Sequence, residues 1–334
     1  MTTTPQTNTT LEQIAEVLHA RDDFVICGHV SPDGDCIGSQ LALWHALRAL
    51  GKNATCVLVK DDPLSADLSF MPGADEMIPA ASFDGVACTF VGVDVPTRER
   101  IGEAACAILD RCDASVTIDH HEVPGAMCDL VYVDPDSASA SVLVWQVVKH
   151  LLEEPPSESA LCAYTGLVSD TGSFKYQNAD ATAFACASEL VSRGVDPSYV
   201  ATNVYQNRTL ASIRLESLMV SRFELLHGGE VALGWVSARE MEELGAVKAD
   251  VDELIETLRS LRGVRVACML REQDGKVRGS LRAKDDTDVA MLARELGGGG
   301  HRAAAGLTLD MELEAARPFM REKLVALVSC GGVA

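Results

Sequence analysis

The segment that most constrains the fold is His29-Val30-Ser31-Pro32-Asp33-Gly34-Asp35-Cys36-Ile37-Gly38-Ser39. It follows the β-like run Phe24-Val25-Ile26-Cys27 and precedes an apolar helical pattern that begins at Leu41, so it is predicted to be a strand-to-helix loop. Such loops carry the functional groups of α/β sheets. One imidazole and two carboxylates lie close together here, a set that suits Mn²⁺ or Mg²⁺. An ordinary polar loop that caps the helix is the alternative.

The composition indicates a globular protein with two domains. The chain has 334 residues, of which 47% are hydrophobic. Its net charge of −21 disfavours binding of a long nucleic-acid duplex but is compatible with a small phosphorylated substrate bound through metal ions. Eleven cysteines without a CxxC pair are expected to be reduced core residues, as in a cytoplasmic protein. Neither a signal peptide nor a membrane span is predicted.

Further ionisable residues follow apolar runs that are expected to be buried strands of a parallel sheet. Residues 86–94 form such a run and end at Asp94, and residues 115–118 are followed by Asp119-His120-His121. Asp170 lies at a glycine-flanked break after a helical segment. Taken singly, Asp94 and Asp170 are more simply explained as helix caps. Adjacent histidines after an aspartate are more typical of a metal site.

Together these segments supply two histidines and four aspartates at predicted strand ends and glycine-rich breaks. This number of ligands fits two metal ions that share one carboxylate. Two such ions can clamp a phosphate and activate a water molecule, so the sequence predicts hydrolysis of phosphoesters. The six candidate ligands are His29, Asp33, Asp35, Asp94, His120 and Asp170.

The C-terminal part is predicted to be a second, smaller α/β domain. Strands are expected at 231–236, 264–270 and 276–283, and helices at 251–261, 289–296 and 312–328. Four glycines at 297–300 precede His301, and eight Lys or Arg residues lie within 259–284. A basic strip beside exposed backbone N–H groups suggests an anion-binding loop. A flexible linker and a solvated strand face are the alternatives.

The chain closely resembles the DHH/DHHA1 phosphoesterase family in the identity and order of these motifs. The matching segments extend over nearly the whole chain and are HVSPDGDCIGS, VGVD, IDHH, TGLVSDTGSF, GSLRA and GGGGHRAAAG. The resemblance implies an α/β fold with an N-terminal parallel-sheet DHH domain at 11–194 and a smaller α/β DHHA1 domain at 227–334. A disordered leader at 1–10 and a helical connector at 195–226 are also expected. The active site would lie in the cleft between the two domains.

The resemblance also implies a role for each site residue. His29 and Asp33 would bind one Mn²⁺ ion, and Asp94 would bridge it to a second ion, with Mg²⁺ as the other candidate metal. The second ion would be bound by Asp35, His120 and Asp170. Asp94, Asp119 and His121 would be catalytic, with His121 facing the phosphate and Asp119 supporting the histidines. Substrate would be bound by Ser280, Arg282, Gly298, Gly299, Gly300 and His301.

Within the family, the compact two-domain arrangement resembles the members that act as nanoRNases and pAp phosphatases. This implies Mn²⁺-dependent hydrolysis of short single-stranded RNA to mononucleotides, and of 3′-phosphoadenosine 5′-phosphate to AMP, by a water molecule that two metal ions activate. Hydrolysis of cyclic or linear di-adenylate is one alternative, and a catalytically silent nucleotide sensor is another. Neither long duplex nucleic acid nor a membrane is an expected partner, whereas a homodimer is left open.

Overall fold

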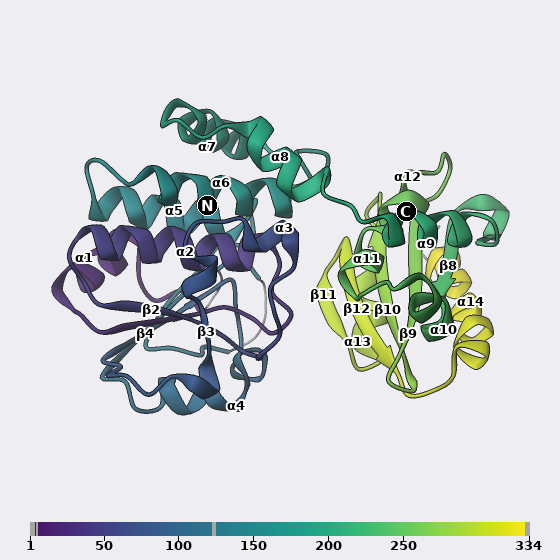
Figure 1. The fold of residues 1–334 in the computed structure, drawn as a ribbon, viewed down its shortest axis with the longest axis horizontal. Helices are drawn as coiled ribbons and strands as arrows, with labels where there is room; N and C mark the ends of the chain where they lie inside the picture. Colours follow the sequence, from purple (N-terminus) through teal and green to yellow (C-terminus); the bar gives the residue numbers. More distant parts are fainter. Residues whose placement is uncertain (1–3, 5, 122–124, 331–334) are drawn as a thin grey trace. The chain divides into compact units, whose positions relative to one another are not determined.

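The computed structural model describes residue 4 and residues 6–121 and 125–330, and the chain divides into two compact units. The N-terminal unit is Met1–Asn207 and the C-terminal unit is Arg208–Ala334. Each unit has its own β-sheet (Figure 1) and its own hydrophobic clusters. The two-part α/β fold expected from the sequence is therefore confirmed.

The N-terminal unit contains a six-stranded sheet in the order β3-β2-β1-β4-β5-β6. Every neighbouring pair of strands in it is parallel. Because all strands point the same way, the residues that follow β1, β4 and β5 meet at one edge of the sheet. The strands are β1 (Phe24–Cys27), β2 (Ala54–Leu58), β3 (Ile78–Pro79), β4 (Thr89–Val93), β5 (Ala114–Asp119) and β6 (Leu130–Val133).

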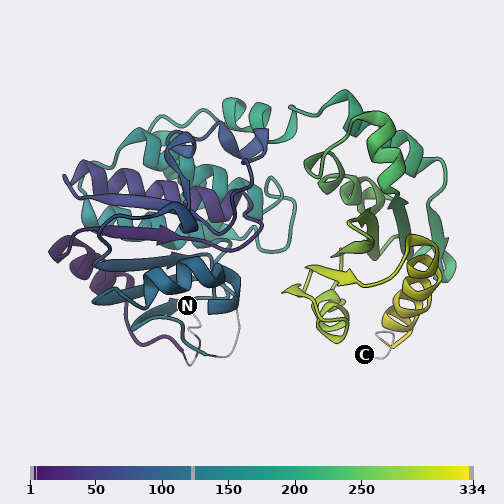
Figure 2. The ribbon, with the colours of Figure 1, turned by 60° about the horizontal axis from the view of Figure 1, so that its bottom comes forward.

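Helices cover both faces of this sheet, as expected for buried parallel strands. Figures 1 and 2 show a layer containing α1, α2 and α5 on one face and α4 on the other. The helices are α1 (Leu11–Ala20), α2 (Gly34–Ala49), α3 (Ala66–Ser69), α4 (Arg98–Leu109), α5 (Ala140–Leu151), α6 (Ser157–Asp170), α7 (Ala181–Ser192) and α8 (Pro197–Tyr205). Two short 3-10 turns lie at Ala74–Glu76 and Ala80–Ser82.

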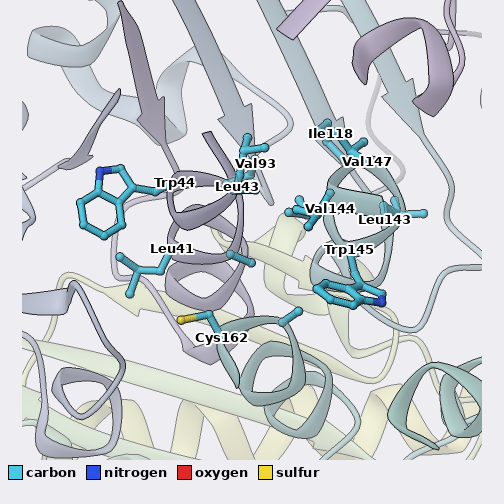
Figure 3. Packing of buried hydrophobic residues seen from close by; sticks show 14 of the residues in the cluster. Leu41, Leu43, Trp44, Val93, Ile118, Leu143, Val144, Trp145, Val147 and Cys162 are labelled. Carbon is cyan, nitrogen blue, oxygen red and sulfur yellow. The ribbon is translucent and has the colours of Figure 1, made fainter. Parts of the chain in front are cut away.

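Helix α2 is the centre of the larger core, and it packs closely against α6. Leu41 of α2, Trp145 of α5 and Cys162 of α6 belong to one buried cluster (Figure 3). A Cβ atom at Gly38 would lie only 2.5 Å from the carbonyl oxygen of Cys162 and 3.0 Å from the amide nitrogen of Gly166. The two helices therefore approach each other to a distance that a side chain at Gly38 does not allow.

Thr4, Thr7 and Asn8, which belong to the leader that was expected to be disordered, instead form hydrogen bonds with the edge strand β6. The amides of Thr4 and Asn8 donate to the carbonyls of Val133 and Val131, at 3.3 and 3.0 Å. The side chain of Asn8 in turn accepts from the amide of Val131 at 2.9 Å. The sequence analysis did not predict strand β6. The polar groups of its outer edge need partners, and the leader supplies them.

The C-terminal unit has a mixed six-stranded sheet in the order β11-β12-β10-β9-β8-β7. Only β8 and β9 pair in parallel, and the other neighbours are antiparallel. The strands are β7 (Glu224–Leu226), β8 (Val231–Val236), β9 (Val266–Gln273), β10 (Lys276–Ala283), β11 (Gly299–His301) and β12 (Ala304–Leu309). The helices are α9 (Leu210–Val220), α10 (Ala238–Leu244), α11 (Ala249–Asp252), α12 (Leu254–Ser260), α13 (Val289–Glu295) and α14 (Leu313–Cys330), and a 3-10 turn lies at His227–Gly229.

Three predictions for this unit need correction. The helix expected at 251–261 is two short helices, α11 and α12. The glycine-rich loop contributes an edge strand, β11, because a Cβ at Gly300 would lie 2.5 Å from the carbonyl oxygen of Ala304 on β12, so only glycine allows this pairing. Several positive charges of the predicted basic strip are paired with carboxylates. Arg265 forms ion pairs with Asp285 and Glu230, and Arg271 and Lys276 also contact carboxylates.

Within the described parts of the chain, every helix is too short or too polar to cross a lipid bilayer.

Replacing Gly38 with alanine is expected to lower the free energy of unfolding. Alanine normally stabilises a helix interior by about 1 kcal/mol relative to glycine, but overpacking a close contact costs about 1–3 kcal/mol. Urea unfolding of Gly38→Ala measures the net change. The control is Gly51→Asn at an exposed position with φ of 75° and open space around it, which asparagine tolerates. A Gly38→Ala protein more stable than wild type would contradict the close packing of α2 and α6.

Candidate metal centre

Asp94 lies at the centre of a cluster of ionisable residues. It follows β4 directly, is 2% exposed and has a φ of 53°, which is unusual for a residue other than glycine. Its Oδ2 atom is 3.3 Å from Nε2 of His29, and its Oδ1 atom is 3.5 Å from Nε2 of His120. These histidines follow β1 and β5, the two strands that flank β4. The two oxygens of one carboxylate therefore face imidazoles from opposite sides.

On the β1 side, His29 is oriented by its own loop. Its Nδ1 atom donates to the carbonyl of Val30 at 3.0 Å, which leaves Nε2 directed at Asp94. The Oδ1 atom of Asp33 is 3.9 Å from the same Nε2 atom and accepts hydrogen bonds from the amides of Asp35 and Cys36. Asp33 therefore caps α2, as the simpler interpretation required, and also lies beside His29.

On the β5 side, His120 is held in a similar way. Its Nδ1 atom donates to the carbonyl of Ser137 at 3.2 Å, and its Nε2 atom is 3.8 Å from Asp35 and 3.9 Å from Asp170. Asp35 is almost fully buried and accepts from the amides of Ala140 and Ser141, at 2.7 and 2.9 Å. These amides open α5, and a helix N-terminus stabilises a buried carboxylate.

Asp170 is the last residue of α6, and the packing of α2 on α6 brings it to the cluster. A Cβ at Gly34 would lie 2.5 Å from Cβ of Ser169, so the start of α2 touches the end of α6. The side-chain amide of Asn178 donates to Asp170 Oδ2 at 3.3 Å and to the carbonyl of Ala138 at 2.8 Å. The sequence analysis did not identify Asn178, because its contact with Asp170 depends on the turn between α6 and α7.

Asp119 fixes the orientation of the third histidine of the cluster. Its Oδ1 atom accepts from Nδ1 of His121 at 2.8 Å and from the backbone amides of His120 and His121. Asp119 is fully buried, whereas His121 retains some exposure. The Nδ1 atom of His121 is also 3.5 Å from Oδ1 of Asp94. One carboxylate therefore holds two consecutive histidines in place.

The cluster places two buried carboxylates and the half-buried carboxylate of Asp170 so close together that their pKa values separate. Burial, together with the charges of Asp94 and Asp170, raises the pKa of Asp35 to about 8. Burial also raises the pKa of Asp170 to about 6. Burial opposes ionisation of Asp94 as well, but the His120 and His29 imidazoles outweigh it and hold its pKa well below the usual range. Asp94 in turn raises the pKa values of His29 and His120 against the effect of burial.

This donor set fits divalent metal ions. One ligand atom each from Asp35, Asp94 and His120 lies within 4.8 Å of the others, and His29 and Asp94 belong to a second such group with Cys36. Oδ1 of Asp94 is buried and accepts no hydrogen bond from the described residues. Carboxylate oxygens and imidazole nitrogens are ligands that Mn²⁺ and Mg²⁺ accept. The chain therefore contains His and Asp groups that could hold metal ions.

The residues predicted to bind substrate lie in the C-terminal unit. Arg282 on β10 and His301 on β11 are both in register with Ala304 of β12, and Ser280 and Gly299 are both in register with Gly306. These side chains therefore share one face at one edge of the sheet. Gly298 and Gly300 complete the predicted set, and a Cβ at either position would collide with β12. The Arg282 guanidinium is 3.7 Å from Glu256 and donates to the carbonyl of Leu281.

Family comparisons agree with this architecture. The model of the DHH family N-terminal domain matches residues 23–167, and the model of the DHHA1 domain matches residues 231–327. The chain belongs to the DHH family and is a phosphoric ester hydrolase.

Three individual similarities stand out. The chain is 32% identical to the bifunctional oligoribonuclease and PAP phosphatase NrnA of Thermus thermophilus, over 93% of each protein. It is 26% identical to the cyclic-di-AMP phosphodiesterase PdeA of Listeria monocytogenes, over 89% of this chain but 46% of that protein. The fold is similar to the crystal structure of an exopolyphosphatase-related protein from Bacteroides fragilis, with a TM-score of 0.87, 26% identity and coverage of 96% of this chain and 97% of that one.

Binding of Mn²⁺ is expected to strengthen with rising pH. In the metal-free protein, burial raises the pKa of Asp35 to about 8, and Asp94 and Asp33 overcome burial to raise the pKa of His29 to about 9. A cation must displace these protons, so the apparent affinity increases as the pH rises to about 9. Calorimetric titration with Mn²⁺ in buffers of different ionisation enthalpy measures affinity and proton release together. An affinity independent of pH would contradict this assignment of ligands.

Proposed function

We propose that this protein hydrolyses short single-stranded oligoribonucleotides to mononucleotides, and 3′-phosphoadenosine 5′-phosphate to AMP, with two divalent metal ions. The similarity to the bifunctional oligoribonuclease and PAP phosphatase of Thermus thermophilus supports this substrate class, because it extends over 93% of both proteins. The observation that carries the chemistry is the position of Asp94. Its two carboxylate oxygens face His29 and His120 separately, as a carboxylate shared between two cations requires.

The ligands divide into two sets around Asp94. His29 and Asp33 would hold one ion, and Asp35, His120 and Asp170 would hold the other, with Mn²⁺ preferred and Mg²⁺ as the alternative. When bound, the ions supply positive charge for the phosphoryl oxygens and lower the pKa of water. The chain's part is to keep these side chains in place. The amides at the start of α5 hold Asp35, Asn178 holds Asp170, and main-chain carbonyls orient both imidazoles.

His121 is proposed to orient the substrate phosphate or to transfer a proton to it. Asp119 accepts from Nδ1 of His121, so Nε2 is the nitrogen that can exchange a proton with a substrate oxygen. Asp119 also raises the pKa of His121 despite its burial, which favours the protonated imidazole that a proton donor needs. Asp119 is thus a positioning residue for His121, whereas His121 contacts the reacting phosphate.

The nucleotide part of the substrate is proposed to bind to the C-terminal unit. Arg282, Ser280 and His301 present polar groups on one face of its sheet, and Gly298, Gly299 and Gly300 leave the backbone there without side chains. The planar guanidinium of Arg282 can bind a phosphate or stack on a base. Its 3.7 Å separation from Glu256 is long for an ion pair, so substrate can compete for it.

A phosphodiesterase specific for cyclic or linear di-adenylate is the second candidate. The similarity to PdeA favours it, but the chain spans less than half of that protein. The nearness of the six residues proposed as ligands supports an active enzyme over a nucleotide sensor without activity. A substrate comparison separates these functions. It includes a two- to five-nucleotide RNA, 3′-phosphoadenosine 5′-phosphate, linear and cyclic di-adenylate and pyrophosphate, each with Mn²⁺.

Asp94→Ala is expected to abolish hydrolysis of the short RNA without unfolding the protein. The substitution removes the only carboxylate that faces both His29 and His120 among the described residues. Release of mononucleotides measures the activity, and circular dichroism measures the folded state. Asp84→Ala changes an exposed aspartate in the loop before β4 and is the matched control. An Asp94→Ala protein with activity comparable to that of Asp84→Ala would exclude the proposed site.

Arg282→Ala is expected to raise the KM for the short RNA about tenfold with a smaller change in kcat. The arginine contributes binding energy away from the reacting phosphate, and a hydrogen bond to a charged group is worth about 1.5–3 kcal/mol. The matched control is Arg278→Ala, which removes another arginine from the same strand. If Arg282→Ala left KM unchanged for every substrate in the comparison, the assignment of this surface to nucleotide binding would be wrong.

A further inference from the structure

Arg100 lies next to the metal-ligand loop, although neither the motifs nor the ligand set includes it. It belongs to the first turn of α4, which Gly102 interrupts with φ of 72° and ψ of 169°. Next to this interruption, the carbonyl of Arg100 accepts a hydrogen bond from the amide of Val30 at 2.8 Å. Val30 directly follows His29, so the backbone of Arg100 is fixed to the loop that carries the first metal ligand.

The guanidinium of Arg100 has no partner among the described residues. It forms no ion pair or hydrogen bond with them, and its Nε atom is buried without an acceptor. This is unexpected in a chain with 49 acidic and 28 basic residues. Arg98, two residues earlier, is more typical, because it contacts Asp110 at 2.6 Å. A buried donor without an acceptor costs free energy, and a bound anion would recover that cost.

Arg100 brings a positive charge close to the metal cluster, because its carbonyl is bonded to the residue that follows His29. Among the described residues of this cluster, the other charged groups are carboxylates and imidazoles. A substrate phosphate that approaches four aspartates is repelled unless cations offset them. A permanently charged arginine at the edge of the cluster offsets part of this repulsion at every pH.

We propose that Arg100 is a substrate-binding residue whose guanidinium contacts the non-bridging oxygens of the phosphate at the His29 side of the cluster. The planar guanidinium can give two parallel N–H donors to one phosphate, a geometry that lysine does not reproduce. Because the carbonyl of Arg100 is bonded to the ligand loop, the backbone from which this side chain extends keeps a fixed position relative to that loop. This inference rests on the proposed hydrolysis of phosphoesters, and it assigns a phosphate contact that is separate from Arg282.

The test compares Arg100→Gln, Arg100→Lys and the matched control Arg98→Gln. Arg100→Gln is expected to lower kcat/KM for the RNA dinucleotide pApA about 10- to 100-fold and to weaken inhibition by inorganic phosphate, because hydrogen bonds to a charged group are lost. Arg100→Lys keeps the charge and is expected to fall between wild type and Arg100→Gln. Arg98→Gln is expected to match the wild type. Calorimetric titration with Mn²⁺ is expected to show no loss of metal affinity in any of the three.

A purely structural role for Arg100 gives different results. In that case Arg100→Gln would lose Mn²⁺ binding together with activity, or would retain both activity and phosphate inhibition, and either result would overturn the proposal. Chemical rescue is a second readout. Guanidinium chloride below denaturing concentrations is expected to restore part of the activity of Arg100→Ala and to leave Arg98→Ala unaffected, and absence of rescue would argue against a direct contact. If wild-type protein cleaves no phosphoester, the proposed function itself fails, while phosphate binding by the Arg100 variants still tests this residue.

Discussion

The position of the Asp94 carboxylate between two histidines is the constraint on which the rest of the candidate metal centre depends. An ionised carboxylate with 2% exposure is costly unless opposite charge or strong donors surround it. Here two imidazoles approach its two oxygens, and the backbone adopts a left-handed φ of 53° that directs the side chain between them. Such strain persists only where surrounding structure fixes it, and the parallel strands on either side of β4 provide that structure.

The fold brings the other proposed ligands to Asp94 by close helix packing. Because Gly34 and Gly38 allow α2 to touch α6, Asp35 at one helix start and Asp170 at the other helix end reach the same histidine. Burial, together with the crowding of these carboxylates, raises the pKa values of Asp35 and Asp170, so the metal-free cluster holds protons where cations would bind. Stability of the helix pair and affinity for metal ions are therefore linked through the same contacts.

The sequence predicted the parts of the site that depend on local pattern. Apolar runs ending at Asp94 and Asp119 identified strand ends, and parallel strands must bring such ends together. It could not predict contacts made across the fold. Asn178 reaches Asp170 only through a turn, Asp35 binds amides more than a hundred residues away, and the leader pairs with β6. The glycines at 299 and 300 were interpreted as a loop because their close approach to β12 is a tertiary property.

The most direct test of a shared Asp94 is the electron paramagnetic resonance spectrum of the protein loaded with Mn²⁺, together with its metal content. Two ions that share a carboxylate interact magnetically, whereas isolated ions give the separate spectrum of mononuclear Mn²⁺. We expect two ions per chain with a spin-coupled spectrum in the wild type, and loss of the coupling in Asp94→Ala. A single ion per chain, or two uncoupled ions in the wild-type protein, would contradict the bridging position of Asp94.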